Sequence, residues 1–264
     1  MAKIKKEDYQ ERYISSRKFL DEKEIGFARN EKPEDLIHFF SCISGKFHFI
    51  AVGDYVNEGN VEMMKNSYYN GAKTISLALK LFDMEEDYEP GSFQSMRQYQ
   101  GLLWALVSDS KEAIMELAEI IGGRGKVDRI GIDRFSYYCG YALKHIVLDD
   151  YEEALKHVEA LEKYKDNSYS AYRVVFRAII EHDQEMLNEG LLLMVEKHKR
   201  NRQYNRMDDK LFSYQTVALA KLAKMKGLEV EIDDPIAPAE VIETHDIGYE
   251  LRDILKNEFE KLGV

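Results

Sequence analysis

Histidines are the side chains of this chain most suited to metal binding or proton transfer, and their spacing predicts neither. The sequence has seven of them, yet no two stand four residues apart with a glutamate between them, as in the zinc motif H-E-x-x-H. His38 and His48 adjoin phenylalanines and are expected on half-buried helix faces. We therefore predict structural or surface roles for the histidines, no metal ligand and no cofactor.

Nucleophilic catalysis is also not indicated. A Gly-x-Ser-x-Gly elbow is absent from the sequence, although a Ser-His-Asp triad assembled from distant positions stays open. Cys139 falls inside a predicted tight helical hairpin, which favours a packed thiol over a nucleophile. Cys42 and Cys139 are far apart in sequence, so we do not expect a disulfide. Unpaired cysteines favour a reducing, cytoplasmic location.

Two segments resemble anion-binding sites only superficially. The stretch GGRGK at 122–126 could direct backbone N–H groups at a phosphate, but Val127 follows the lysine where a phosphate-binding loop needs Ser or Thr. The basic run KHKRNRQYNR at 197–206 could contact a nucleic-acid backbone. It lies at the end of a predicted helix, where cations complement the helix dipole. We therefore expect a solvated helix end or intramolecular pairing with neighbouring acidic loops.

Acidic side chains form two dense groups. They are Asp83, Glu85, Glu86, Asp87 and Glu89 before Pro90-Gly91, and Glu229, Glu231, Asp233 and Asp234 before Pro235. Such runs are usually solvated loops. They also suit a surface that steers and docks a strongly basic protein, because complementary potentials speed association. We interpret these nine residues as candidate partner-binding residues.

The elements that carry these groups are predicted to be helices. Helical periodicity extends over residues 5–28, 34–56, 60–82, 92–107, 110–121, 132–148, 151–164, 169–181, 184–200, 208–226 and 247–262. Breaks at 108–110, 149–150 and 182–183 are short and polar, and can cap the following helix. Strand signals are confined to 228–232, which is too little for a sheet. An all-α protein follows.

The breaks predict antiparallel hairpins, because short connections fold consecutive helices against each other. The clearest hairpin is CGYALKHIVLDDYEEALKHVEAL at 139–161, in which Gly140 allows close helix approach. Weaker echoes begin at 106 and 183, at spacings that bracket the 34-residue tetratricopeptide period. We expect irregular stacked hairpins, tetratricopeptide-like in the C-terminal half, in a single domain 1–264 with an N-terminal layer 1–90 packed on a hairpin stack 91–264.

Overall charge restricts the partners. The formal net charge is −11, from 48 acidic and 37 basic side chains, which repels nucleic acid and attracts basic proteins. The N-terminal residues run directly into a charged helical pattern without an apolar stretch that would predict a signal peptide or membrane span. We therefore expect no nucleic-acid partner and no membrane partner.

The segment FSYQTVALAKLAKMKGLEVEIDDPIAPAEVI at 212–242 is the most informative. An apolar helix face, built from Leu211, Tyr214, Val217, Ala218, Leu222 and Met225, is followed by the helix stop Gly227, an alternating acidic stretch and Pro238. This pattern resembles the C-terminal signature of the bacterial immunity protein 49 family, which is found in polymorphic toxin systems. The N-terminal third shows no counterpart.

The resemblance implies an immunity protein that binds and neutralises a cognate bacterial toxin by occlusion, without catalysis. The excess of acid favours a basic toxin. Two other classes stay open on the sequence: a helical-repeat scaffold that binds a peptide between its hairpins, and an enzyme with a pocket of paired ionisable groups.

Overall fold

The computed structural model describes residues 6–27, 33–85, 88–163, 170–200 and 207–263. Over these ranges the chain forms thirteen α-helices and three short 3-10 helices, with no strand. Among the described residues, one antiparallel bridge joins Asp234 and Ala237, in the tail after the expected 228–232 segment. The predicted all-α class is confirmed.

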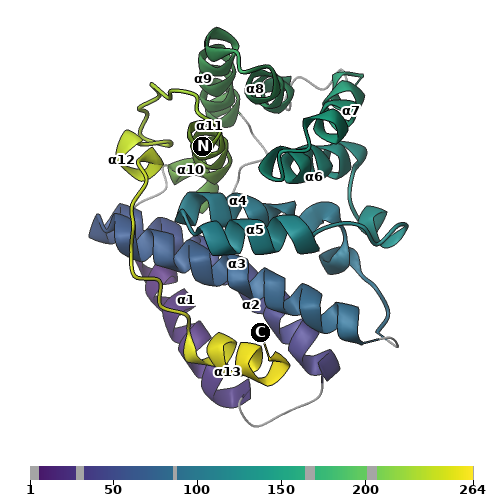
Figure 1. Ribbon diagram of the computed structural model, residues 1–264. Helices are drawn as coiled ribbons and strands as arrows, with labels where there is room; N and C mark the ends of the chain where they lie inside the picture. The colour runs from purple at the N-terminus through teal and green to yellow at the C-terminus, as the bar shows by residue number, and fades with distance from the viewer. Residues whose placement is uncertain (1–5, 28–32, 86–87, 164–169, 201–206, 264) are drawn as a thin grey trace.

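The N-terminal helices form one layer. The helices α1 (Lys6–Phe27), α2 (Pro33–Glu58) and α3 (Val61–Met84) pack side by side, and α4 (Tyr99–Ser108) and α5 (Lys111–Ile120) cross over α3 (Figure 1). The Leu36–Glu58 part of α2 is long and apolar enough to cross a membrane, but 67% of its most apolar window is buried inside the protein. Buried core helices meet the same criterion, so α2 is weak evidence for a span.

Two further hairpins follow, α6 (Arg134–Val147) with α7 (Tyr151–Glu162) and α8 (Ser170–Glu181) with α9 (Gln184–Arg200). The three predicted breaks are confirmed as caps: Ser110, Asp150 and Asp183 accept hydrogen bonds from backbone N–H groups three residues later. Each cap follows a left-handed residue, Asp109, Asp149 or His182. The tetratricopeptide-like character of this half stays a prediction.

The prediction of one continuous helix over 208–226 is wrong. The segment is divided into α10 (Met207–Leu211) and α11 (Tyr214–Met225), because the Ser213 backbone N–H donates to the Ile236 carbonyl at 2.7 Å while its side chain caps α11. The predicted stop is confirmed, since Gly227 has φ +84° directly after the Lys226 cap. Met225 departs from the predicted buried face, with 49% of its surface exposed.

The expected helices 92–107 and 247–262 both begin later in the structure. The first starts as two 3-10 turns, Ser92–Gln94 and Met96–Gln98, before α4. The second begins only at α13 (Asp253–Leu262). The backbone between the short α12 (Ala239–Ile242) and α13 is extended along α3 instead of helical. There Asn70 donates to the Glu250 carbonyl and accepts from the Arg252 N–H, both at 2.9 Å. Figure 1 shows this yellow tail descending to α13 beside the N-terminal helices.

The largest buried apolar cluster runs through most of the chain. It includes Tyr9 of α1, Met64 of α3, Trp104 of α4, Ala154 of α7 and Ile242 of α12. A second cluster joins α1, α2 and α3 with Leu255 and Phe259 of α13. The predicted boundary near residue 90 stays a prediction.

Candidate functional site

The first acidic group lies at the end of α3. Asp83 forms a two-pronged ion pair with Arg124, with Nε to Oδ1 at 2.8 Å and Nη2 to Oδ2 at 2.5 Å. Glu89 is exposed to solvent, whereas Glu85 is half-buried. Glu86 and Asp87 lie outside the described residues. Asp83 thus connects α3 to the 122–126 loop and is committed to an internal contact.

The second acidic group lies in the tail after α11, where side chains alternate although no strand forms. Ile232 is buried and Val230 half-buried, while Glu229 and Glu231 are exposed. Asp233 accepts a hydrogen bond from the Ala239 N–H at 3.0 Å. The alternation directs two carboxylates outward and packs the apolar side chains against the core.

Two contacts fix this tail. Asp234 pairs with Lys199 of α9, with Nζ to Oδ2 at 2.6 Å. The Gln184 side chain donates to the Glu229 carbonyl at 2.7 Å and accepts from the Glu229 N–H at 2.9 Å. The acidic loop is therefore held in one conformation relative to α9.

The structure does not bring the two acidic groups together. In Figure 1 the end of α3 and the tail between α11 and α12 lie on opposite sides of the molecule. A partner that contacts one group through a small interface does not reach the other.

The acidic tail borders an exposed apolar side chain. Leu192 of α9 has 63% of its surface exposed, and it lines a small pocket of about 130 Å³ with Asn188, Glu231 and Ile232. We call Asn188, Leu192, Glu229 and Glu231 the α9–tail surface. It combines an apolar centre with outward carboxylates, as protein-binding surfaces do.

A buried charge network, which the sequence analysis did not find, fastens the tail to the helices. Asp109 accepts from Lys65 of α3 and from Lys221 of α11, the latter at 2.5 Å, and all three side chains are at most 6% exposed. Both lysines also donate to the Glu243 carbonyl, at 2.7 and 3.1 Å. Burial is the main cause that lowers the pKa of Lys221 to about 7; Asp109 opposes this shift and Lys65 adds to it.

A second group, also missed, is formed by the buried His48 and Asp208 with the half-buried Asp209. The His48 Nε2 lies 3.4 Å from Asp208 Oδ2 and 3.9 Å from Asp209 Oδ1. His48 is 4% exposed, so its expected half-buried position is wrong. The only sequence feature that pointed to this group was the adjacent pair Asp208-Asp209. Such pairs are too common to predict that His48, 160 residues earlier, lies beside them.

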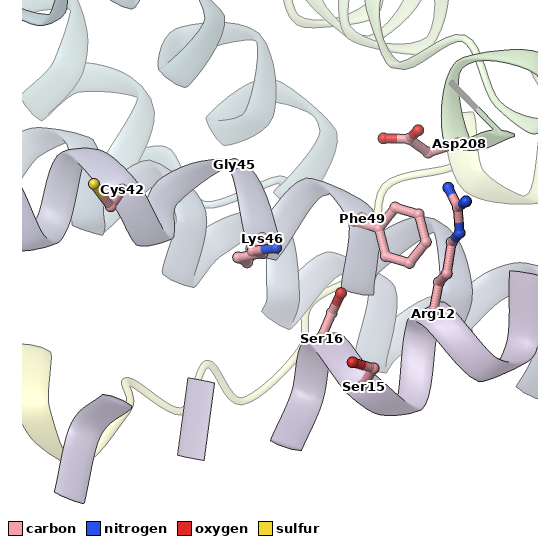
Figure 2. Close-up of a pocket in the computed structure, with 8 residues that line it drawn as sticks. All are labelled: Arg12, Ser15, Ser16, Cys42, Gly45, Lys46, Phe49 and Asp208. Atoms are coloured by element: carbon pink, nitrogen blue, oxygen red, sulfur yellow. The ribbon is translucent and has the colours of Figure 1, made fainter. Parts of the chain in front are cut away.

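Two cavities reach this group. One, of about 520 Å³, is lined by residues of α1 and α2 and by Asp208. Figure 2 shows the Arg12 guanidinium directed toward the Asp208 carboxylate beside Phe49. The other, also about 520 Å³, is lined by His48, Asp209 and the aromatic rings of Trp104 and Tyr214.

The anion-binding motifs set aside on the sequence have internal partners. In the 122–126 loop the Gly123 N–H donates to the Tyr141 hydroxyl and the Arg124 N–H to Asp128. In the basic run, Lys199 pairs with Asp234, and residues 201–206 lie outside the described ranges. Cys139 is buried, and burial raises the pKa of its thiol, whereas Cys42 is exposed. The packed thiol predicted at Cys139 is confirmed.

The fold defines an all-helical protein of stacked hairpins with an extended tail that is fastened by buried charges. The family model described as Immunity protein 49 matches residues 132–241, from just before α6 to α12. The resemblance to the immunity protein 49 family is thereby confirmed across these residues. The match also covers the α6–α9 hairpins, beyond the 212–242 segment that suggested it. No curated protein and no solved structure matches the chain.

Proposed function

We propose that this protein neutralises a cognate toxin by binding and occluding it, with no catalytic step of its own. The observation that carries the proposal is the Immunity protein 49 match over residues 132–241. This region contains the α9–tail surface, whereas the acidic group at the end of α3 lies outside it. We therefore assign toxin contact to the α9–tail surface.

The α9–tail surface is suited to a basic partner. Glu229 and Glu231 are exposed, in a protein of net charge −11, so the potential attracts cationic surfaces and speeds their association. Leu192 supplies an apolar contact beside them, where desolvation contributes affinity.

Preorganisation favours tight binding at this surface. The two hydrogen bonds of Gln184 to the Glu229 backbone and the Lys199–Asp234 ion pair fix the loop before any partner arrives. Binding then pays little conformational entropy for loop ordering. A rigid loop also presents its two carboxylates at a constant spacing.

The decisive experiment expresses the chain together with the product of the neighbouring gene. We expect growth to be rescued and the two proteins to copurify as a stable complex. Rescue without a complex, combined with turnover of the toxin or its product by the purified chain, would favour an enzyme instead. Absence of both rescue and complex, with the neighbouring product shown to be toxic, would reject the immunity function for that pair.

A further inference from the structure

We propose that His48, Asp208 and Asp209 form a binding site for a divalent transition-metal ion such as Zn²⁺. One ligand atom from each residue lies within 4.8 Å of the other two. The donors come from α2 and from α10, two helices that are in contact and stand 160 residues apart. This site is independent of the proposed toxin contact and differs from the expectation that the histidines bind no metal.

The spacing of the donors fits a tetrahedral ion. Zinc bonds to imidazole nitrogen and carboxylate oxygen at about 2.0 to 2.1 Å, which places neighbouring ligand atoms roughly 3.3 Å apart. The distances from His48 Nε2 are 3.4 Å to Asp208 and 3.9 Å to Asp209. Binding would move the Asp209 oxygen about half an ångström closer to Nε2. The two carboxylate oxygens, which lie within 4.8 Å of each other, would approach by up to about 1.5 Å.

The chemistry of the donor set also fits. One imidazole with two carboxylates is a mixed nitrogen and oxygen set, which zinc and its neighbours in the first transition row accept. A neutral imidazole and two carboxylates neutralise a dication, which matters because the Asp208 side chain is 1% exposed and that of His48 5%. The exposed Arg12, which lines one cavity with Asp208, adds a solvent-screened positive charge at the edge of the site.

The imidazole is positioned as metal-binding histidines usually are. Its other nitrogen, Nδ1, lies 2.9 Å from the Tyr68 hydroxyl, an outer contact that fixes the ring. Trp104 stacks on the ring at 5.9 Å between centroids with an angle of 7°, and Tyr214 approaches edge-on at 4.7 Å. Nε2 is thus held facing the two aspartates.

The two cavities give a metal ion access to the site and leave room for water ligands. One includes Asp208 in its lining and the other includes His48 and Asp209, so an ion can enter from either and bind water on the side of the cavity. With three protein ligands, the fourth position is left for water or an incoming ligand. The ion would fasten α10 to α2.

The test is isothermal titration of the chelator-treated full chain with ZnCl₂, together with Co²⁺ absorption spectra and thermal unfolding. We expect one ion per chain and Co²⁺ bands typical of four-coordinate nitrogen and oxygen ligands. Free Zn²⁺ at 100 times its dissociation constant should shift the unfolding equilibrium roughly 100-fold. Tyr68→Phe should weaken affinity about 10- to 100-fold, as loss of an outer-shell partner does.

Variants distinguish this site from adventitious zinc. His145 lies 3.1 Å from Asp150 and stacks on His157, so this more exposed group is the alternative zinc binder. His48→Gln and Asp209→Asn should abolish stoichiometric binding, whereas His145→Gln should retain it. Asp209→Asn is nearly isosteric, and circular dichroism verifies its fold. Lack of a bound ion in the wild-type chain, or loss only in His145→Gln, would overturn the proposal.

Discussion

Lys221 of α11 and Asp109 at the end of α4 form an ion pair 2.5 Å long, across 112 residues of sequence, with side chains 2% and 6% exposed. The other oxygen of Asp109 accepts from Lys65 of α3. One carboxylate therefore joins three helices, and the two lysines hold the Glu243 carbonyl of the tail. The backbone of Asp109 is in the left-handed conformation, with φ +68°, because this residue ends α4 and the chain reverses there to begin α5.

Replacing Asp109 with Ala should destabilise the protein strongly. It leaves two buried lysine side chains without their shared carboxylate, and removal of one partner from a buried ion pair costs about 3 to 5 kcal/mol. The positive φ of residue 109, which Ala adopts only with strain, adds to this loss. The free energy of unfolding, measured by urea denaturation, should fall by that amount.

A matched control for this loss is Lys224→Met, three residues after Lys221. Lys224 pairs with Glu243, but its side chain is 29% exposed and that of Glu243 65%. The change should cost at most about 1 kcal/mol, as exposed pairs do. Equal losses in both variants would show that the Asp109 network contributes no more than a surface pair.

Stability should rise with pH through the Lys221 amine. Burial, opposed by Asp109 and assisted by Lys65, gives it a pKa of about 7 in the folded chain, against an ordinary value of 10.5. Between these values the unfolded chain binds more protons, so the free energy of unfolding increases with pH, on the order of 1 kcal/mol per pH unit at most. Below about pH 7 both states are protonated and the contribution is constant.

The comparison that isolates this effect is the wild type against Lys221→Met. The difference in unfolding free energy between the two should grow from pH 7 to pH 9 in favour of the wild type, while other titrating groups cancel. Lys65, Asp109 and the Glu243 carbonyl lie beside the amine, and His245 contacts Lys65; all four residues are present in both proteins. A flat difference over this range would contradict the lowered pKa.

Local signals explain why most helices could be predicted from the sequence. Ser110, Asp150 and Asp183 are cap residues whose partners lie three positions away, so a short window contains the whole interaction. The break between α10 and α11 was missed because the partner of the Ser213 N–H is the carbonyl of Ile236, far along the chain. The extended tail was missed for the same reason, since Asn66 and Asn70 pair with residues about 180 positions later.

The chemical groups were harder to predict than the helices. Lys65, Asp109 and Lys221 are ordinary charged residues in sequence, and only the packing of α3, α4 and α11 brings them together. A charged Lys221 among Val217, Ala218 and Leu222 was the available signal, because a lysine deep in an apolar stretch of helix requires a partner. The acidic loops were found because their charge is contiguous in sequence.

Close helix packing at Gly190 gives a further prediction. A methyl group there would lie 2.8 Å from the Val175 Cγ2 and 3.2 Å from the Val175 backbone nitrogen, so α8 and α9 would have to separate. We expect Gly190→Ala to lower the free energy of unfolding by about 1 to 3 kcal/mol. Gly45→Ala in α2 is the control, because no contact from elsewhere in the described part of the chain lies within 4 Å of its added methyl. It should stabilise by up to about 1 kcal/mol. If neither variant changed the free energy of unfolding, the close packing at the α8–α9 contact would be contradicted.

Charge reversal can locate the toxin contact. Glu229→Lys with Glu231→Lys reverses the outward carboxylates of the α9–tail surface, whereas Glu85→Lys with Glu89→Lys reverses the same number of acids on the opposite side of the molecule. Against a basic toxin, the first pair should slow association at least about 10-fold at low salt and reduce its salt dependence. Stopped-flow or surface-based kinetics measure both quantities.

The two charge-reversed variants share the same net charge, −7 in place of −11, so long-range attraction falls equally in both. A difference between their association rates must therefore come from where the charges lie. Slower association only in the 229/231 variant assigns the contact to the tail beside α9. Equal slowing in both variants would show that only the overall charge matters. Slowing only in the 85/89 variant would place the contact at the end of α3, outside the family match.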